Sequence, residues 1–200
     1  MYVPRFNALD DEDAIRAMVR AIGAGELVTV GEDGYPLGTR LPVVWDGDRL
    51  VMHIARANPH WRSVPADVDM PALVVVTDAE AYVSPAWYAS KAEHGRVVPT
   101  WNYSAVQLTG RVRRHEDPAW LREAVTMLTR LRESDRAEPW SVSDAPETYV
   151  EKQLRAIVGL ELTIERVEGK AKLSQNRSDE DRAGVAAALG DHPLAARTRP

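Results

Sequence analysis

The stretch Glu26-Leu-Val-Thr-Val-Gly-Glu-Asp-Gly-Tyr-Pro-Leu-Gly-Thr-Arg-Leu-Pro-Val-Val-Trp-Asp-Gly-Asp-Arg-Leu-Val-Met-His-Ile-Ala55 decides the fold class. Three runs rich in Val, Leu and Ile, at residues 26–30, 38–46 and 49–55, have the composition of β-strands. The sequences Glu-Asp-Gly-Tyr-Pro and Asp46-Gly47-Asp48 separate the runs and favour tight turns. Because short turns join antiparallel neighbours, the stretch predicts an antiparallel meander.

The rest of the chain supplies helices and further strands. Ile15, Met18, Val19 and Ile22 recur at helical spacing and predict a first helix that ends at Gly23. We also predict a short helix from Asn58-Pro59 through Trp61, strands at 72–77, 79–83, 103–115 and 160–164, and helices beginning at Pro118, Pro146 and Ser178. This order favours a small, mainly antiparallel β-barrel with peripheral helices over a parallel doubly wound sheet. We expect one domain over residues 1–190 and a disordered tail over residues 191–200.

The composition narrows the function classes. The chain has 200 residues, of which 44% are hydrophobic and 28% charged, so it can bury a core. It has no cysteine, which excludes disulfides, thiolate nucleophiles and cysteine-based metal sites. No run approaches the roughly 18 apolar residues of a membrane span, and the Met1-Tyr-Val-Pro-Arg start lacks the apolar segment of a signal peptide. We therefore expect a cytoplasmic protein without membrane contact.

The charge balance bears on nucleic acid binding. A net charge of −5 argues against broad contact with phosphates, which requires a basic face. The nearest thing to a basic patch is Arg111, Arg113 and Arg114 in one predicted strand. No predicted helix is basic on one face, so the sequence gives little support to direct DNA binding.

Two polar stretches, residues 84–103 and 169–177, carry most of the functional information. Each gathers cations, amides and hydroxyls without hydrophobic periodicity, and the first adds four aromatic rings. This composition suits a concave site for a flat, partly anionic ligand. Taken singly, each basic residue is typical of a solvated surface charge, and each tryptophan of a core or interface. Their joint placement in two atypical segments favours the ligand.

A phosphate is the best-supported part of that ligand. Arg56 ends a predicted strand just before Asn58-Pro59 opens a helix, so a cation and helix-terminal N–H groups are predicted to converge on one anion. Lys91, Lys172 and Arg177 are further candidates. The chain has no GxGxxG, Walker or GxSxG sequence, which removes the commonest competing motifs.

Five segments, in order and at family-like spacing, give the chain a resemblance to a known family. They are His53-Ile-Ala-Arg-Ala-Asn-Pro-His-Trp61, Tyr82-Val-Ser-Pro-Ala-Trp-Tyr88, Lys91-Ala-Glu-His-Gly-Arg-Val-Val-Pro-Thr-Trp-Asn-Tyr103, Glu138-Pro-Trp-Ser-Val-Ser-Asp144 and Lys172-Leu-Ser-Gln-Asn-Arg177. With them the chain resembles the PaiB family, described as FMN-binding negative transcriptional regulators, from Met1 to about Leu189. One position departs from the pattern, because Ala171 stands where family members usually carry an aromatic residue.

The resemblance implies a split β-barrel related to the pyridoxamine-phosphate-oxidase-like flavoproteins, normally a homodimer with FMN at the subunit interface. It places Thr39, Arg40 and Leu41 along the isoalloxazine ring. It places Arg56, Asn58 and Trp61 near the ribityl phosphate. The remaining residues of the implied pocket, from this chain or its partner, are Lys91, Trp101, Lys172, Ser174, Gln175, Asn176 and Arg177.

Three functions stay open at this point. The resemblance implies a negative transcriptional regulator that acts as a flavin-dependent sensor. An FMN-dependent oxidoreductase or flavin reductase is the alternative, in which the protein orients the flavin and tunes its electronics. A haem-binding barrel is the third, with His53, His60 or His94 as the axial ligand.

Overall fold

The computed structural model describes residues 1–200 and divides into two compact units. Unit 1 comprises Met1–Ile15, Thr77–Val106 and Glu168–Pro200, and unit 2 comprises Arg16–Val76 and Gln107–Val167. Three long strands, β5 (Met70–Val83), β6 (Thr100–His115) and β7 (Ile157–Lys172), have residues in both units. The two units are therefore connected by continuous strands. The single domain expected over residues 1–190 stays a prediction.

Unit 2 contains the meander. Its strands are β2 (Ala24–Val30), β3 (Pro36–Asp46), β4 (Arg49–Ala55) and the parts of β5, β6 and β7 that belong to this unit. Antiparallel pairs join β2 to β3, β3 to β4, β4 to β7 and β2 to β5. The complete strand order is β1-β7-β4-β3-β2-β5-β6, and β6 pairs with β7 as well. That extra pairing closes six strands into a ring, which confirms the predicted barrel.

The barrel of unit 2 is filled by alternate residues of its strands. Buried and partly exposed positions alternate along β2, as a strand with one face on a core requires. The largest completely buried side chains include Leu27, Leu50, Met52, Leu160 and Leu162. Where β6 meets β7, a Cβ atom on Gly110 would lie 1.9 Å from the carbonyl oxygen of Thr163, so only glycine permits this approach.

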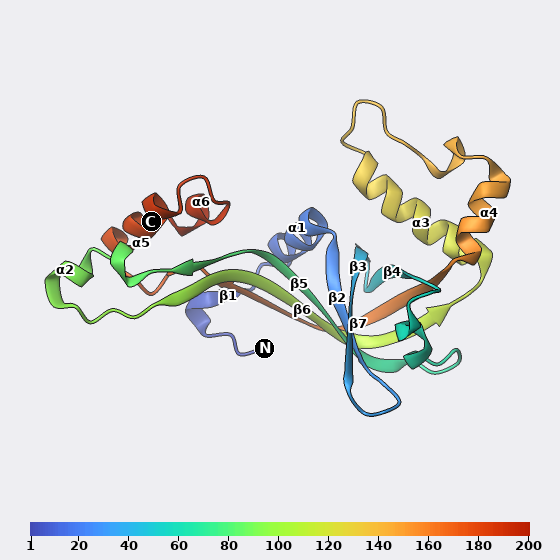
Figure 1. Ribbon diagram of the computed structural model, residues 1–200, viewed down its shortest axis with the longest axis horizontal. Coiled ribbons are helices and arrows are strands. Elements are labelled where there is room, and N and C mark those ends of the chain that lie inside the picture. The colour runs from blue at the N-terminus through green and yellow to red at the C-terminus, as the bar shows by residue number, and fades with distance from the viewer. The chain divides into compact units, whose positions relative to one another are not determined.

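Helices border the barrel strands within unit 2. The 3₁₀ helix η2 (Pro59–Ser63) follows β4, and α3 (Pro118–Glu133), η4 (Val142–Asp144) and α4 (Glu147–Arg155) lie between β6 and β7. Asp117 caps α3 by accepting a 2.9 Å hydrogen bond from the Trp120 amide. A long loop connects α3 to α4 (Figure 1). No helix of the chain is long and apolar enough to cross a bilayer.

Unit 1 holds the remaining elements. They are η1 (Arg5–Asn7), β1 (Ala8–Leu9), η3 (Pro85–Trp87), α2 (Ser90–His94), α5 (Asp179–Leu189) and α6 (Leu194–Thr198), while α1 (Glu12–Ile22) begins in unit 1 and ends in unit 2. The segment with η3 and α2 connects β5 to β6 (Figure 1). It is tied to α5 because Asp181 accepts hydrogen bonds from the Ser90 amide and hydroxyl at 2.9 and 2.7 Å.

Three local expectations were wrong. The two strands predicted at 72–77 and 79–83 are one strand, β5, which continues through Asp78 although Asp is disfavoured in strands. β7 extends to Lys172 instead of ending at Ile164, because its polar end pairs with β1 at Leu9 and Gly169. The expected disordered tail contains α6, whose Leu194 is completely buried.

Candidate functional site

The thirteen residues predicted to bind the cofactor fall into two sets, which we describe separately. Unit 2 holds Thr39, Arg40, Leu41, Arg56, Asn58 and Trp61; unit 1 holds Lys91, Trp101, Lys172, Ser174, Gln175, Asn176 and Arg177.

His60, between two predicted residues, organises the unit 2 set. Its Nδ1 lies 2.7 Å from the Thr39 hydroxyl and its Nε2 lies 2.8 Å from the Thr29 hydroxyl. Asn58 accepts a 3.0 Å hydrogen bond from the His60 amide and donates a 3.4 Å bond to the Thr39 hydroxyl. Burial lowers the pKa of His60, opposed by the charge of Glu26. His60 therefore joins Asn58 to Thr39, with its backbone amide bonded to Asn58 and its imidazole bonded to Thr39.

The same geometry corrects one part of the phosphate prediction. The helix-terminal N–H of His60 is already used by the Asn58 side chain, and η2 has only five residues. One of the helix-terminal N–H groups expected at the anion is therefore already occupied, and the rest of that expectation stays a prediction.

Arginine side chains surround the next predicted residue, Trp61. The guanidinium carbons of Arg56, Arg62 and Arg114 lie 5.6, 5.4 and 5.1 Å from the centre of the Trp61 ring. Guanidinium groups are attracted to the face of an aromatic ring at such distances. The indole N–H donates a 2.9 Å hydrogen bond to the carbonyl oxygen of Arg56, which fixes the ring. We call Arg56, Arg62 and Arg114 the arginine cluster.

Positive charge in the arginine cluster exceeds the negative charge beside it. Glu116 pairs with Arg56 at 2.7 Å and with Arg114 at 3.3 Å, whereas Arg62 has no ion pair. Arg56 also donates to the carbonyl oxygens of Arg155 and Ile157 at 3.1 and 3.3 Å. The atom of Arg114 that faces Glu116 is its buried Nε, which at 3.3 Å forms an ion pair without hydrogen-bond geometry. Two of the three guanidinium groups thus share one carboxylate and the third has none, which leaves capacity for another anion.

Sequence reasoning missed two members of the arginine cluster. Arg62 directly follows Trp61 in the sequence, and this adjacency was the available signal. Arg114 was predicted only as part of the nearest thing to a basic patch, but its side chain is 16% exposed and its guanidinium lies over the Trp61 ring. The contact joins positions far apart in the chain, which no local pattern reveals.

The three predicted residues of β3 do not act alike. Leu27 pairs with Thr39 and Glu26 with Arg40 in the register of β2 and β3. Successive side chains of a strand alternate between faces, so Thr39 and Leu41 share one face and Arg40 takes the other. Leu41 is buried in the core and Arg40 is exposed, so Thr39 is the member that contacts the rest of the set.

In unit 1, two lysines at the end of β7 are held without carboxylates. Lys172 donates a 2.9 Å hydrogen bond to the carbonyl oxygen of Trp101 and another to the Thr100 hydroxyl. Lys170 donates to the carbonyl oxygen of Tyr2 at 3.0 Å, and its ammonium lies 5.3 Å from the centre of the Tyr103 ring. Burial lowers the pKa of Lys172, the charge of Lys170 adds to this, and Tyr103 opposes it. We call Lys170 and Lys172 the lysine pair.

The turn after β7 fixes three more predicted residues. Ser174 is buried in the left-handed region at φ 66° and accepts a 3.0 Å hydrogen bond from Asn102. Gln175 accepts a 2.7 Å bond from the Leu173 amide, and the guanidinium of Arg177 lies 4.7 Å from the centre of the Tyr88 ring. Ser174 and Gln175 therefore shape the turn, whereas the exposed Asn176 amide makes no hydrogen bond.

Trp101 and Lys91 are more accessible members of the unit 1 set. Trp101 is 45% exposed and meets the half-exposed Tyr82 edge to face, with ring centres 6.2 Å apart. Lys91 lies in α2 with an exposed side chain. Exposed neighbouring aromatic rings are typical of a surface that contacts a ligand or another subunit.

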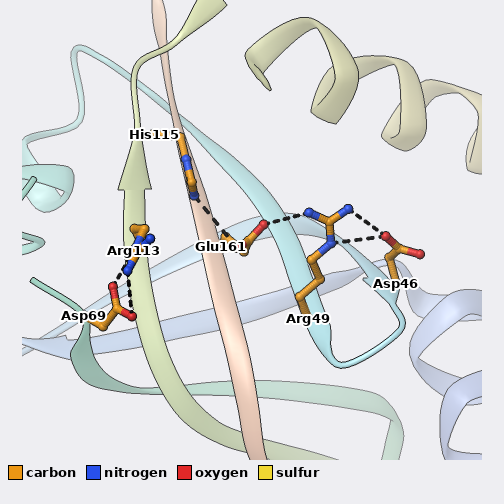
Figure 2. A network of polar contacts seen from close by, with 6 residues as sticks. All are labelled: Asp46, Arg49, Asp69, Arg113, His115 and Glu161. Atoms are coloured by element: carbon orange, nitrogen blue, oxygen red, sulfur yellow. Dashed lines mark hydrogen bonds and ion pairs between the residues drawn. The ribbon is translucent and has the colours of Figure 1, made fainter. Parts of the chain in front are cut away.

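The strand proposed as the nearest basic patch is neutralised. Arg113 contacts both carboxylate oxygens of Asp69 at 2.6 and 3.1 Å, Arg111 pairs with Glu165 at 3.3 Å, and Arg114 pairs with Glu116. Figure 2 shows the same alternation of charge nearby, where Arg49 bridges Asp46 and Glu161 beside His115. This face does not offer DNA a run of free cations.

The histidines considered as haem ligands differ in whether their ring nitrogens are already hydrogen-bonded. Both ring nitrogens of His60 are hydrogen-bonded, and Nδ1 of His94 accepts a 3.0 Å bond from the Arg96 amide. His53 lines a cavity of about 260 Å³, described below. No group of three or more His, Asp or Glu side chains is arranged to hold a metal ion.

Comparison with known proteins places this geometry in a family. The model of a family described as "Putative FMN-binding domain" matches residues 1–166. The protease synthase and sporulation protein PAI 2 of Bacillus subtilis is 32% identical over 189 residues, covering 92% of this chain and 87% of that protein. An uncharacterized protein of Aspergillus fumigatus is 42% identical over 119 residues, covering 52% of this chain and 46% of its own length.

Solved structures show the same fold at low identity. The FAD and haem binding protein of Mycobacterium smegmatis superposes with a TM-score of 0.61 at 21% identity, covering 90% of this chain and 78% of that one. A flavocytochrome of Azotobacter vinelandii gives 0.59 at 19% identity, covering 91% and 78%. Together with the family match, these findings show that the chain belongs to the FMN-binding split-barrel family that includes the Bacillus subtilis protein.

Proposed function

We propose that this chain holds the phosphate of FMN on the arginine cluster and serves as a flavin-dependent sensor. The observation that carries the proposal is the charge of that cluster, where three guanidinium groups lie around Trp61 and two of them pair with Glu116 while Arg62 has no ion pair. A phosphate monoester carries about −1.5 to −2 charge at pH 7, which complements the excess. When bound, FMN supplies an isoalloxazine ring that accepts and releases electrons.

The Arg56–Glu116 pair does not prevent phosphate binding. The two side chains are 38% and 42% exposed, and an ion pair this accessible contributes about 0–1 kcal/mol. A phosphate offers more acceptor oxygens and more charge than one carboxylate, so Arg56 gains by exchanging Glu116 for the phosphate. In the same unit, His60 holds Asn58 and Thr39 next to each other.

We propose that the unit 1 set, supplied by the partner subunit of a homodimer, contacts the isoalloxazine ring. The lysine pair has no carboxylate neighbour, so its ammonium groups are available to carbonyl oxygens of a flavin and to the negative charge that a reduced flavin acquires. Trp101 offers a half-exposed ring for stacking. Arg177 and Asn176 belong to the same set and lie on the turn after β7.

A purified sample tests the cofactor assignment directly. Protein isolated without added flavin is expected to show flavin absorption bands, or to acquire them when FMN is added. A colourless protein that takes up no FMN overturns the proposal, and a Soret band identifies the haem alternative instead.

The Arg56→Ala variant tests the phosphate assignment. It is expected to weaken FMN far more than riboflavin, because riboflavin lacks the phosphate and a charge-assisted contact contributes roughly 1.5–3 kcal/mol. Arg136→Ala is the matched control, since Arg136 is an exposed arginine of unit 2 paired with Glu133. Equal losses for FMN and riboflavin in Arg56→Ala show that Arg56 supports the fold or the ring site.

An oxidoreductase or flavin reductase is the second candidate. It is favoured by the lysine pair, because cationic groups that stabilise a reduced flavin raise its tendency to accept electrons. Anaerobic addition of NADH or NADPH separates the candidates. Rapid bleaching of the flavin bands identifies a reductase, and unchanged bands support a passive sensor.

We propose that the chain works as a homodimer with FMN at the subunit interface. Support comes from the half-exposed Tyr82 and Trp101, which leave apolar area bare on one chain. Sedimentation equilibrium at low micromolar concentration is expected to show a dimer. A species of only 22.2 kDa contradicts this.

We further propose that this chain regulates transcription without tight direct DNA binding. The net charge of −5 and the paired arginines of β6 support this. Gel-shift titration is expected to show weak, salt-sensitive and sequence-indifferent binding. Nanomolar binding of a promoter fragment, but not of its shuffled version, in physiological salt would falsify this.

A further inference from the structure

His53 differs from the other histidines in having a buried polar atom and a cavity beside it. Its Nδ1 is shielded from solvent and has no hydrogen-bond partner. His60, His94 and His192 each use Nδ1 in a hydrogen bond within the chain. Nε2 of His115 also lacks a hydrogen bond, but it lies 4.0 Å from the Glu161 carboxylate and its ring is stacked on Trp120 at 4.1 Å. Buried polar atoms are nearly always satisfied, so the Nδ1 atom of His53 calls for a partner.

The cavity that His53 lines has a volume of about 260 Å³ and lies entirely within unit 2. Besides His53, its walls are Val125, Thr129, Trp140, Val142, Ala145, Tyr149, Val150, Gln153, Leu154 and Ile157. Val150 and Leu154 are buried, whereas Trp140 and Tyr149 are 48% and 56% exposed and mark the accessible side. None of the lining residues is an acid, a lysine or an arginine.

Hydrogen bonds hold the wall formed by the long loop between α3 and α4. The Trp140 amide donates to Glu133 at 3.3 Å, and the Ser141 amide donates to Asp144 at 2.7 Å. Val142 and Ala145 pack against a buried hydrophobic cluster that includes Val150 and Leu154. The cavity is therefore built into the fold, and its wall is not a free loop.

Size, neutrality and the unpartnered nitrogen together define the ligand. A dry cavity of about 150 Å³ accepts benzene, so this one has room for an aromatic ring with substituents or for two fused rings. A wall without ionised groups favours a neutral ligand. Burial lowers the pKa of His53, which keeps its imidazole neutral. A hydroxyl group both donates and accepts, so it satisfies Nδ1 in either tautomer.

We infer that this cavity binds a small neutral aromatic molecule that carries a hydroxyl group, with His53 as its hydrogen-bond partner. The site takes no phosphate and does not depend on FMN. Such a ligand is a candidate signal for a sensor.

The test compares p-cresol with toluene, which have the same ring and methyl group but differ by the hydroxyl. Calorimetric titration of the whole chain is expected to show saturable binding of both, with p-cresol about 5–10-fold tighter, as one net hydrogen bond predicts. In protein with ¹⁵N-labelled histidine, p-cresol is expected to shift the Nδ1 resonance of His53 alone. Absence of saturable binding, or equal affinity for both probes, overturns the inference.

Three variants locate the hydroxyl contact. His53→Leu is expected to bind both probes equally, and Thr129→Val, a nearly isosteric change in the same wall, to keep the preference for p-cresol. Ala145→Leu fills the cavity and is expected to abolish binding of both. Circular dichroism and thermal unfolding verify that each variant is folded. If His53→Leu fails to fold, the ¹⁵N shift decides the question. A preference for p-cresol that survives in His53→Leu and disappears in Thr129→Val contradicts the assignment to His53.

Discussion

The arginine cluster of unit 2 and the lysine pair of unit 1 are both small groups of basic residues. The structure treats their charges differently. The guanidinium groups lie around an aromatic ring and two of them share one exposed carboxylate, whereas the lysines donate to carbonyl and hydroxyl oxygens under partial burial. Excess accessible charge suits a phosphate, and desolvated ammonium groups suit the carbonyl edge of a flavin. The comparison teaches that a cation's partners, more than its place in a motif, indicate its role.

Removing two members of the arginine cluster is the strongest way to break this comparison. Arg56→Ala combined with Arg62→Ala is expected to weaken FMN by about 10²–10⁴-fold, because each charge-assisted contact contributes about 1.5–3 kcal/mol. Riboflavin affinity is expected to change little. Fluorescence titration with both ligands measures the effect, with Arg136→Ala as the control. An FMN loss below threefold would remove the arginine cluster from the phosphate site.

Neutralising Lys172 tests the part of this comparison that concerns the lysine pair. The methionine of Lys172→Met keeps most of the side-chain length without the charge. This variant is expected to weaken the binding of FMN and of riboflavin by the same factor of about 10, since one hydrogen bond from a charged group is lost. The exposed Lys152 on α4 provides the control variant Lys152→Met. A loss confined to FMN would place Lys172 at the phosphate instead.

Much of this comparison rests on features that local sequence patterns predict. The strands β2 to β4 follow from alternating apolar residues and Gly-containing turns, and Asn58, Asp117 and Ser178 cap helices as expected. These signals depend on neighbours in the chain, so the sequence contains them.

The rest depends on contacts that the sequence does not encode locally. The polar end of β7 becomes a strand because β1 pairs with it, which no periodicity indicates. Arg114 joins Trp61, and Glu116 joins Arg56, only when β6 and η2 meet in the fold. The sequence therefore predicted Arg56 and Trp61 as members of the candidate site, but not the residues that contact them.

The buried histidines of unit 2, unlike its arginines, make the free energy of unfolding depend on pH. Burial lowers the pKa of His53, His60 and His115 below the ordinary value of 6.5. As the pH falls below about 6.5, these histidines are therefore protonated in the unfolded chain while they stay neutral in the folded chain. The free energy of unfolding then decreases with falling pH, by at most about 1.4 kcal/mol per pH unit for each histidine.

His115→Phe isolates one of these contributions, because phenylalanine retains the stacking on Trp120. Urea unfolding between pH 5 and 8.5 is expected to give a shallower decline below pH 6.5 for the variant and parallel curves above pH 7.5. An equally steep acid decline in the variant would show that His115 is protonated as easily in the folded chain as in the unfolded one.

The smallest expected effect has the opposite sign. Glu116→Gln removes the carboxylate that competes for Arg56 and Arg114, so FMN is expected to bind up to about fivefold tighter, the equivalent of an exposed ion pair. Riboflavin affinity is expected to stay constant in the same titration. Weaker FMN binding would mean that Glu116 positions the arginines for the phosphate.

The measurement that tests the central claim most directly is a parallel titration of the unaltered protein with FMN and riboflavin at low and high salt. With the phosphate on the arginine cluster, FMN is expected to bind at least about 100-fold tighter than riboflavin, and salt to reduce the FMN affinity while leaving riboflavin nearly unchanged. Equal affinities for the two flavins, or equal responses to salt, would contradict the account.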